Sequence, residues 1–495
     1  MVRNIHLTPV LCAAAGAAFG FYLFGLISFA MLLVIAFALL AALCFFRVAA
    51  SMRENFSGEA GHEIKKLARL AALYSAALAA GFVFGVCAAN AGRNVISFAL
   101  PQEKIIAVEG VLLEDPRIID GGRAMAVLSL QRCAGTRGLR ASGKGKITVF
   151  FPQENALRLR EFGRGAAVFT EGVLRATDTG QIFSAESMHI VKPAAPVQKM
   201  RTGIRLKLID KFGGKAWGGL ALALLLGIRD NLDTSLAVMY RDAGCSYILA
   251  LSGMHLAVLA ALIAFLLKKP LGFKGAAIAG ALIICLYCFI VGPMPSLNRA
   301  AIMYLLGVLT LLGAFPKEPL SILALSFLLQ IAVSPSQGNS ISFILSYCAL
   351  AGILLIGQHL YYLLSGKAPD FLLQPLTASC GAFLATAGIT SFAFGVLAPA
   401  GIITGLALVP LTTFFMIGSM IWLALDLISF SFVLSPLLSL LYKLMEKIVS
   451  IAGSVPRIST SRHAVILFIS LIASVLIAAL VYRRRCAIDR LAPFP

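Results

Sequence analysis

The stretch LALSGMHLAVL, residues 249–259, places a serine and a histidine three positions apart in an otherwise apolar segment. On a helix this spacing puts Ser252 and His255 on one face, about one turn apart. The uncharged segment around them runs from 243 to 267, and His255 is its middle residue. An ionisable group in the middle of a membrane span is costly, by about 2.5–3.5 kcal/mol for a full charge, and therefore indicates function.

Three interpretations of this pair are open. A serine beside a histidine suggests a Ser/His hydrolase that acts within the membrane, of the rhomboid type. Rhomboids, however, carry a glycine at the place of Ala250 and take the histidine from another helix. A base one turn away on the same helix is poorly placed to activate Ser252. The pair could instead hold neighbouring helices together by hydrogen bonds, or it could line a polar path.

A second polar group lies in VGPMPSLNRAAIMY, residues 291–304, where a glycine and two prolines interrupt a helix. Ser296 is expected to cap the next helix, whose first turn then carries Asn298 and Arg299. Arg299 is the only charged residue between positions 274 and 317. A helix N-terminus with an adjacent arginine suits phosphate or carboxylate, so the sequence predicts an anion-tolerant cavity. A proline kink with Arg299 reaching to the membrane surface is the alternative.

Composition places these groups in a membrane protein. Hydrophobic residues make up 59% of the chain, charged residues 13%, and the mean hydropathy is +0.91. No soluble globular domain has this composition. Residues 7–46 contain no Asp, Glu, Lys or Arg, which is enough for two spans. Apolar residues continue well beyond the length of a signal peptide, so we expect an uncleaved anchor.

Further uncharged stretches predict the remaining spans. The two longest are split by breaks at 334–339 and 398–401, which gives roughly twelve spans when each needs ~20 residues. The stretches after the first are 70–92, 243–267, 275–298, 300–316, 319–358, 371–425, 427–442 and 464–482.

Lysine and arginine cluster in 47–69, 268–274 and 483–485. Placing these clusters in the cytoplasm puts both termini inside. The span 427–442 fits this scheme least well, because the basic stretch 443–463 then falls outside.

Residues 100–195 have a different texture and are predicted to lie outside the membrane. Short β-rich runs alternate with turn residues, and the candidate strands are 104–113, 123–131, 146–151, 166–175 and 181–190. Five short strands suit a small barrel of the OB type. Such barrels often bind single strands with a basic groove and aromatic platforms, although a packing module with a solvated basic surface fits equally well.

The basic segment 196–217 is expected to form an amphipathic helix in the membrane surface. The apolar run that follows, 218–228, is too short to span and is expected to re-enter the membrane. The net charge of +20 would attract either a polyanion or acidic lipid headgroups.

Several chemistries find no support in the motifs. GLRASGKG, residues 138–145, has P-loop spacing, but Gly145 stands where Ser or Thr is required and a strand is predicted to follow. The ten cysteines are scattered and suggest no disulfide framework. Cys285 and Cys288 lie on an apolar stretch and are expected to pack. We predict no catalytic residue, no metal and no cofactor.

A family resemblance rests on several of these motifs together. The run from LLLGIRD through YRDAG to LALSGMH (224–255), the break GPMPSLNRAAIM (292–303) and the stretch SFILSYCALAGILLIG (342–357) resemble the ComEC family of DNA-uptake proteins. The resemblance spans most of the chain, from residue 1 to about 480, because 100–195 occupies the place of the family's OB-like module.

The resemblance implies a channel in the bacterial inner membrane that passes single-stranded DNA into the cytoplasm during natural transformation. The implied path comprises Ser252, His255, Ser296, Asn298 and Arg299. A supporting polar loop comprises Asp230, Arg241 and Asp242. A transporter of a small anionic metabolite is an alternative, as is the Ser/His hydrolase.

The expected partners are single-stranded DNA, membrane lipid, a cytoplasmic ATPase or helicase, a DNA receptor and a separate nuclease, with a second copy of the chain as an open alternative. The nuclease is expected to be separate because the sequence stops soon after Arg485, where many family members add a metallo-β-lactamase-like domain. Two positions depart from the family pattern: Tyr247 replaces a usual histidine, and Gly405 falls where an asparagine often precedes Val-Pro.

The predicted architecture is an all-α polytopic membrane protein with an inserted small all-β, OB-like extracytoplasmic domain. Its segments are N-terminal helices with a basic cytoplasmic loop at 47–69 (1–99), the OB-like domain (100–195), the interfacial segment (196–217), the competence-type channel domain (218–482) and a basic cytoplasmic tail (483–495).

Overall fold

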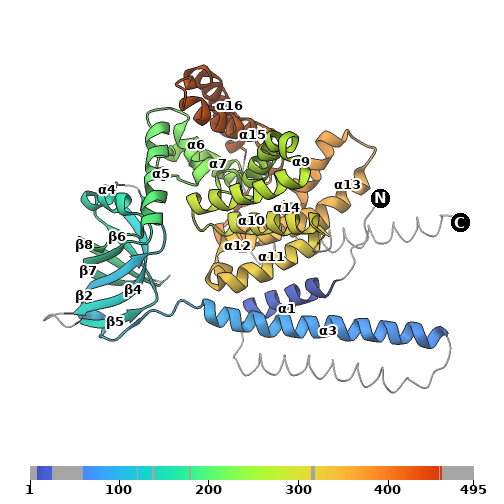
Figure 1. Ribbon diagram of the computed structural model, residues 1–495, viewed down its shortest axis with the longest axis horizontal. Helices are drawn as coiled ribbons and strands as arrows, with labels where there is room; N and C mark the ends of the chain where they lie inside the picture. The colour runs from blue at the N-terminus through green and yellow to red at the C-terminus, as the bar shows by residue number, and fades with distance from the viewer. Residues whose placement is uncertain are drawn as a thin grey trace.

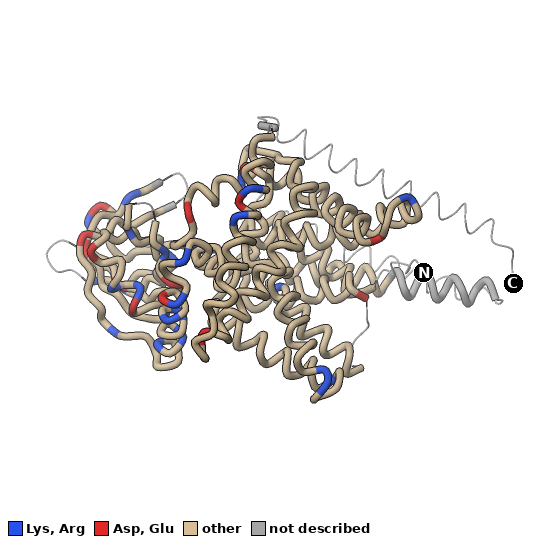
Figure 2. The backbone as a smooth tube through the Cα atoms, turned by 90° about the horizontal axis from the view of Figure 1, so that it is seen from above, with Lys and Arg blue, Asp and Glu red and all other residues tan. Residues whose placement is uncertain are grey.

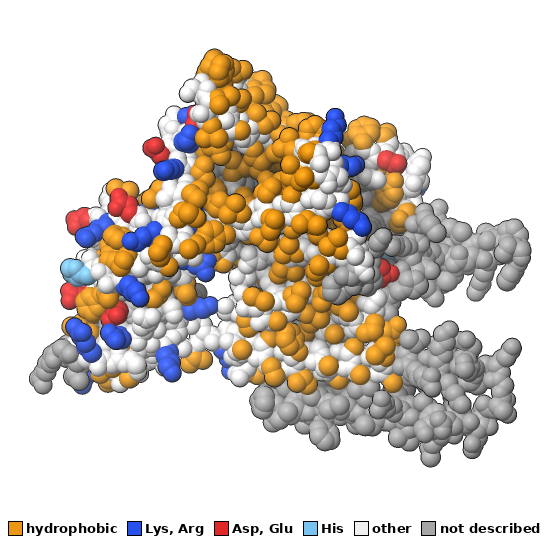
Figure 3. All heavy atoms as spheres, in the orientation of Figure 1, with side chains coloured by type: hydrophobic (Ala, Val, Ile, Leu, Met, Phe, Trp, Pro, Cys, Tyr) orange, Lys and Arg blue, Asp and Glu red, His pale blue; other side chains and the backbone are white. Residues whose placement is uncertain are grey.

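The computed structural model describes residues 8–24, 59–119, 121–135, 140–177, 180–313, 318–455 and 458–459. A small β-barrel lies at one end of an apolar helical bundle (Figure 1). Charged residues gather on the barrel and on the segments beside it, whereas most of the bundle carries none (Figure 2). Hydrophobic side chains spread over the outer surface of the bundle (Figure 3). This partition is typical of a bundle embedded in lipid with a water-exposed domain attached.

The described helices range in length from 4 to 39 residues. They are α1 (Pro9–Leu23), α3 (Glu59–Gly92), α4 (Gln153–Phe162), α5 (Pro196–Phe212), α6 (Gly218–Leu226), α7 (Thr234–Asp242), α8 (Ser246–Leu249), α9 (Gly253–Val291), α10 (Pro295–Leu311), α11 (Pro319–Val333), α12 (Ile341–Gly352), α13 (Gln358–Leu364), α14 (Asp370–Phe394), α15 (Ala400–Asp426) and α16 (Ser435–Gly453), with short 3-10 or π turns η2 (Gln102–Lys104), η4 (Pro335–Asn339), η5 (Ile353–Gly357) and η6 (Ser431–Val433).

Five helical segments in the described part of the chain are long and apolar enough to cross a membrane. They are Ala72–Gly92, Gly253–Val291, Ile341–Leu364, Asp370–Phe394 and Ala400–Asp426. The breaks expected at 334–339 and 398–401 are confirmed, because η4 and the α14–α15 connection occupy them. Most of 7–46 and the whole of 464–482 lie outside the described residues. The count of twelve spans therefore stays a prediction.

The expected span 243–267 is wrong. Gly244 adopts φ +72 and Ser252 is extended, so the helix that contains His255 begins only at Gly253. That helix, α9, reverses at Gly272, where φ is +70, and its second arm returns beside the first, as the close approach of Ile263 to Gly280 indicates. His255 therefore lies in the first turn of a helical hairpin and not at mid-span.

The expected span 427–442 is also wrong. The chain turns at η6, and α16 starts at Ser435 and continues to Gly453. Lys443, Glu446 and Lys447 lie within this helix, which makes it amphipathic rather than membrane-spanning.

The β-domain is a closed barrel of five long strands. Antiparallel pairs join β2 to β4, β4 to β6, β7 to β8 and β2 to β7, and a parallel pair joins β6 to β8. The strands are β2 (Ile105–Leu112), β4 (Ala124–Gly135), β6 (Lys146–Phe151), β7 (Ala167–Thr177) and β8 (Gly180–Lys192). Each of the five predicted strands corresponds to one of them. Helix α4 connects β6 to β7.

Shorter strands escaped the sequence pattern because two to five residues carry no alternation. These are β1 (Ser97–Phe98), β3 (Arg117–Ile118) and β5 (Arg140–Lys144) at the barrel, and β9 (Val396–Leu397) with β10 (Ile458–Ser459) in the bundle. The P-loop-like stretch ends in β5 and is followed by β6, so a strand stands where a phosphate-binding helix would be needed.

The phenylalanines of the barrel do not form an exposed platform. Phe151 and Phe183 are fully buried in its core. Phe150, Phe162 and Phe169 are half-buried. The rings therefore serve mainly to pack the barrel.

Helix α5 connects the barrel to the bundle, and two of its cations, Arg201 and Arg205, are bound within the protein. That the segment 196–217 lies in the membrane surface stays a prediction. The Arg201 side chain is 1% exposed and forms a bidentate ion pair with Asp115 of the barrel, with N–O distances of 2.9 and 2.6 Å. It also donates to the carbonyls of Phe289 and Val291 at the end of α9. Arg205 lies 3.3 Å from Asp115 and donates to Val291 as well.

These contacts favour the ionised form of the Asp115 carboxyl group. Burial alone would raise the pKa of its carboxyl, but hydrogen bonds from Arg201 and the charge of Arg205 outweigh burial and hold the pKa below its usual value. Because the folded-state pKa is depressed, the stabilisation is present at neutral pH. It is lost as the pH falls below about 4, the ordinary pKa of a free aspartate.

Replacing Asp115 with Asn should destabilise the protein by about 3–5 kcal/mol, because the buried Arg201 loses its charged partner. Thermal unfolding of the purified full-length protein in detergent measures this. The control is Glu114→Gln, which removes a neighbouring exposed carboxylate paired only with exposed Arg117. Equal melting temperatures for the two variants would contradict the importance of this ion pair.

Helices α1 and α3 pack through glycines that let the two backbones touch. A Cβ at Gly16 or Gly20 would lie 2.1 or 2.3 Å from a carbonyl oxygen of α3, and one at Gly81 or Gly85 would lie 2.0 or 2.1 Å from a carbonyl oxygen of α1. Both helices thus present a Gly-x-x-x-Gly pair at the crossing, an arrangement typical of membrane helices.

A matched pair of substitutions tests this crossing. Gly81→Ala should lower stability by about 1–3 kcal/mol, because its Cβ would overlap the carbonyl of Ala13. Gly307→Ala, on α10 where nothing lies within 4 Å of the added Cβ, should raise stability by about 0.4–1 kcal/mol. Melting temperatures that move in the same direction would refute the close crossing.

Candidate functional site

Ser252 and His255 form a local hydrogen-bonded cap at the start of α9. The Ser252 N–H donates to His255 Nδ1 at 3.1 Å, and Ser252 Oγ lies 3.0 Å from the same nitrogen. This contact belongs to a helix cap in which Nδ1 already accepts the backbone N–H, so the expectation that His255 is poorly placed to activate Ser252 stays a prediction. Ser252 precedes the helix and has an extended backbone, so its side chain reaches back over the first turn.

His255 carries an unsatisfied buried donor. Its Nδ1 accepts the backbone N–H of Ser252, so in the neutral ring the proton belongs on Nε2. The residue is 1% exposed, and Nε2 has no hydrogen-bond partner among the described residues. A buried donor without an acceptor costs about 1–3 kcal/mol, so this edge of the ring favours an incoming acceptor.

Arg299 lies on α10, just after the break between α9 and α10. It is 8% exposed, donates from Nη1 to the Ser346 carbonyl and stands 5.8 Å from the centre of the Tyr347 ring. Its Nε has no partner, and no carboxylate within the described residues forms an ion pair with it. The alternative of an arginine that reaches to the membrane surface does not fit this burial.

Two further predicted residues of α10 turn toward α12 and η4. Ser296 Oγ lies 3.3 Å from Ser342 Oγ, and Asn298 donates to Gln337 at 3.5 Å. Ser296 is not the N-cap, contrary to the prediction. Met294 holds that position because Pro295, whose fixed φ suits the first helical position, starts the helix two residues earlier than predicted.

Gln330 and Tyr347 connect these groups into one buried network. Gln330 donates to the Pro295 carbonyl at 2.9 Å and to Gln337 at 3.1 Å, and it accepts from the Tyr347 hydroxyl at 3.0 Å. We call the whole set the polar seam; its members are Ser296, Asn298, Arg299, Ser326, Gln330, Gln337, Ser342 and Tyr347. Sequence analysis missed Gln330, although it is the single side-chain amide in the uncharged run 319–333.

The cap and the polar seam meet at Arg299. A Cβ placed on Gly253 would lie 3.2 Å from Arg299 Nη2, so the guanidinium stands beside the N-terminus of α9. The positive end of a helix dipole and a guanidinium without a carboxylate partner are thus adjacent. Positive potential accumulates at this point, inside an otherwise apolar bundle.

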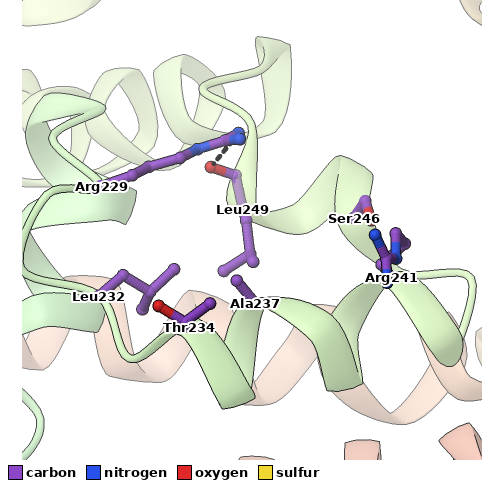
Figure 4. A pocket seen from close by; sticks show the side chains of 7 residues that line it. All are labelled: Arg229, Leu232, Thr234, Ala237, Arg241, Ser246 and Leu249. Atoms are coloured by element: carbon purple, nitrogen blue, oxygen red, sulfur yellow. Dashed lines mark hydrogen bonds between the residues drawn. The ribbon is translucent and has the colours of Figure 1, made fainter. Parts of the chain in front are cut away.

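The predicted supporting loop lies apart from the polar seam. Asp230 pairs with Arg160 of α4 at 3.6 Å, and Arg241 lies 3.5 Å from Asp242 at the end of α7. Asp230 thus borders the barrel, whereas Asp242 lies beside Gly453 at the end of α16. Arg241 also lines a surface pocket together with Arg229 (Figure 4).

The two positions that depart from the family pattern are in contact. A Cβ on Gly405 of α15 would lie 2.3 Å from the Tyr247 hydroxyl. The Tyr247 hydroxyl thus occupies space that a side chain at position 405 would need.

Among the described residues, no group of three or more His, Cys, Asp or Glu side chains is arranged to hold a metal ion.

An apolar bundle with a buried cation, a polar seam and a charged barrel at one end defines a polytopic membrane protein with a polar interior. Residues 224–485, a little over half of the chain, match the family model of competence proteins. The chain therefore belongs to the competence protein family, a membership that fits a role in DNA uptake for transformation. Comparison with curated proteins and with solved structures gave no match.

The network predicts a measurable role for one hydroxyl. Tyr347→Phe should lower stability by about 1–3 kcal/mol, because Gln330 Oε1 is then buried without a donor while the ring beside Arg299 remains. Tyr362→Phe, at a residue 41% exposed, is the control and should change little. Thermal unfolding in detergent compares the two, and an unchanged Tyr347→Phe variant would argue against a connected seam.

Proposed function

We propose that the protein is an inner-membrane channel that passes single-stranded DNA into the cytoplasm. The observation that carries this proposal is Arg299: a buried guanidinium without a carboxylate partner, beside the N-terminus of α9. Such a group favours phosphate, and phosphate is the one group that every nucleotide presents regardless of sequence. Membership of the competence family agrees with a DNA substrate.

In this proposal the described conformation is a closed path. Ser296 is hydrogen-bonded to Ser342 and Asn298 to Gln337, which joins α10 to α12 and η4. Arg299 donates to the Ser346 carbonyl. Opening would exchange these contacts for phosphates and water. The free donors at His255 Nε2 and Arg299 Nε are then available to the strand.

The barrel is proposed to be an OB-like module on the outer side of the membrane, with both chain termini in the cytoplasm and about twelve spans in all. Five strands closed into one barrel, with a helix between β6 and β7, support the OB-like assignment. Because its phenylalanines are buried or half-buried, any contact with DNA would rely on charged side chains rather than on base stacking.

The protein is proposed to supply the path and no chemistry. The force for transport would come from a cytoplasmic ATPase or helicase, and a receptor and a nuclease outside the membrane would deliver one strand.

A second candidate is an intramembrane hydrolase, because Ser252 Oγ lies within hydrogen-bond distance of His255. The two functions separate at Ser252. A nucleophile is indispensable, whereas a cap residue costs only about 0.5–2 kcal/mol of stability when changed to alanine.

The test measures uptake of labelled transforming DNA in cells whose only copy carries one substitution, with protein level checked by blot. Arg299→Ala and His255→Ala should reduce uptake at least about tenfold, since a contact to a charged group is worth about 1.5–3 kcal/mol. Lys367→Ala, an exposed lysine before α14, is the control.

The outcomes discriminate between the candidates. DNA retained outside the inner membrane by the Arg299 variant, with Ser252→Ala still active, supports the channel. Loss of function in Ser252→Ala at normal protein level favours the hydrolase, and normal uptake in the Arg299 variant overturns the channel mechanism.

A further inference from the structure

A surface pocket of about 310 Å³ lies where the α6–α7 loop meets α7 and α8. It is lined by Arg229, Leu232, Thr234, Arg241, Ser246 and Leu249, and it shares no residue with the polar seam (Figure 4). Both ionisable side chains that line it are arginines. This volume is at the lower end of ligand sites and suits a single nucleotide unit or a similar group.

Arg229 is a fixed cation without a counter-charge. Its Nη2 donates to the Leu249 carbonyl at 3.0 Å, which holds the guanidinium at one side of the pocket. No ion pair involves it within the described part of the chain. Burial and, secondly, the charge of Arg117 on the barrel lower the pKa of Arg229, which indicates an environment short of negative charge.

The opposite side of the pocket supplies further donors. Arg241 is 67% exposed and lies 3.5 Å from Asp242 through Nε, so the two terminal amino groups of its guanidinium remain accessible. Ser246 lies beside it, and Thr234 lies at the start of α7 (Figure 4). Two guanidinium groups and two hydroxyls are the donor set that binds phosphate oxygens.

The position of the pocket connects the barrel with the polar interior. The ion pair between Asp230 and Arg160 holds the residue next to Arg229 against helix α4 of the barrel. On the other side, Leu249, which anchors Arg229, is followed three residues later by Ser252 at the start of α9. The pocket thus lies beside the contact with the barrel at Asp230 and, along the chain, just before the start of α9.

We propose that the pocket binds a phosphodiester group of single-stranded DNA before the strand enters the seam. This inference rests on the proposed channel function and names a site for its substrate. An anionic lipid headgroup presents the same chemical group, so the experiment must separate the two sources.

The test uses the full-length protein in nanodiscs of zwitterionic lipid and a fluorescein-labelled oligothymidylate, with binding followed by anisotropy over a series of salt concentrations. Arg229→Ala and Arg241→Ala should each weaken binding several-fold. Each should also reduce the slope of log K against log salt by about 0.7, the value for one phosphate contact on a single strand. Arg229→Lys should keep the slope, and Lys367→Ala serves as the control with equal loss of charge elsewhere.

Three results would overturn the inference, and they have different consequences for the proposed channel function. An unchanged slope in both arginine variants, with wild-type binding intact, removes the pocket but leaves the channel to the uptake test at Arg299. Loss of the Arg229-dependent binding when phosphatidylglycerol is added to the discs assigns the pocket to lipid. Absence of oligonucleotide binding by the wild type counts against the channel itself. Matching melting temperatures establish that the variants are folded.

Discussion

Arg201 is a buried cation whose contacts join three parts of the molecule. It belongs to α5, its carboxylate partner Asp115 belongs to the barrel, and its carbonyl partners lie at the end of α9. A charge removed from water costs several kcal/mol unless its partners are in place. The barrel, the connecting helix and the end of α9 are therefore fixed relative to one another, and the break that starts α10 follows immediately after this point.

The position of the break determines where the polar residues of α10 lie. Because α9 ends at Val291, the first turns of α10 face η4 and α12, and Ser296, Asn298 and Arg299 are buried there together. The barrel contacts the opposite wall as well, since Lys146 donates to Ser336 of η4 at 2.9 Å. Both walls of the polar seam are thus attached to the barrel, so a movement of the barrel would act on the seam directly.

Patterns in the sequence predicted the structural features that depend on residues close together in the chain. The long strands of the barrel were located within a few residues because alternation reports which face is buried, and Pro or Gly marked the breaks between helices. The span 243–267 failed because an absence of charge says nothing about backbone angles, and Gly244 and Ser252 end the helical path. The role of Arg201 was not predictable, because its partner Asp115 is 86 positions away.

The site was predicted by residue type, but its electrostatics came from the fold. Two buried arginines in this chain have opposite surroundings. Arg201 meets a carboxylate that neutralises it, and it holds the structure together. Arg299 meets a carbonyl and an aromatic ring, which stabilise a guanidinium without cancelling its charge. A carboxylate at Arg299 would compete with every passing phosphate, whereas a carbonyl and a ring leave a cation that an anion can reach and leave. That difference is what the proposed path requires.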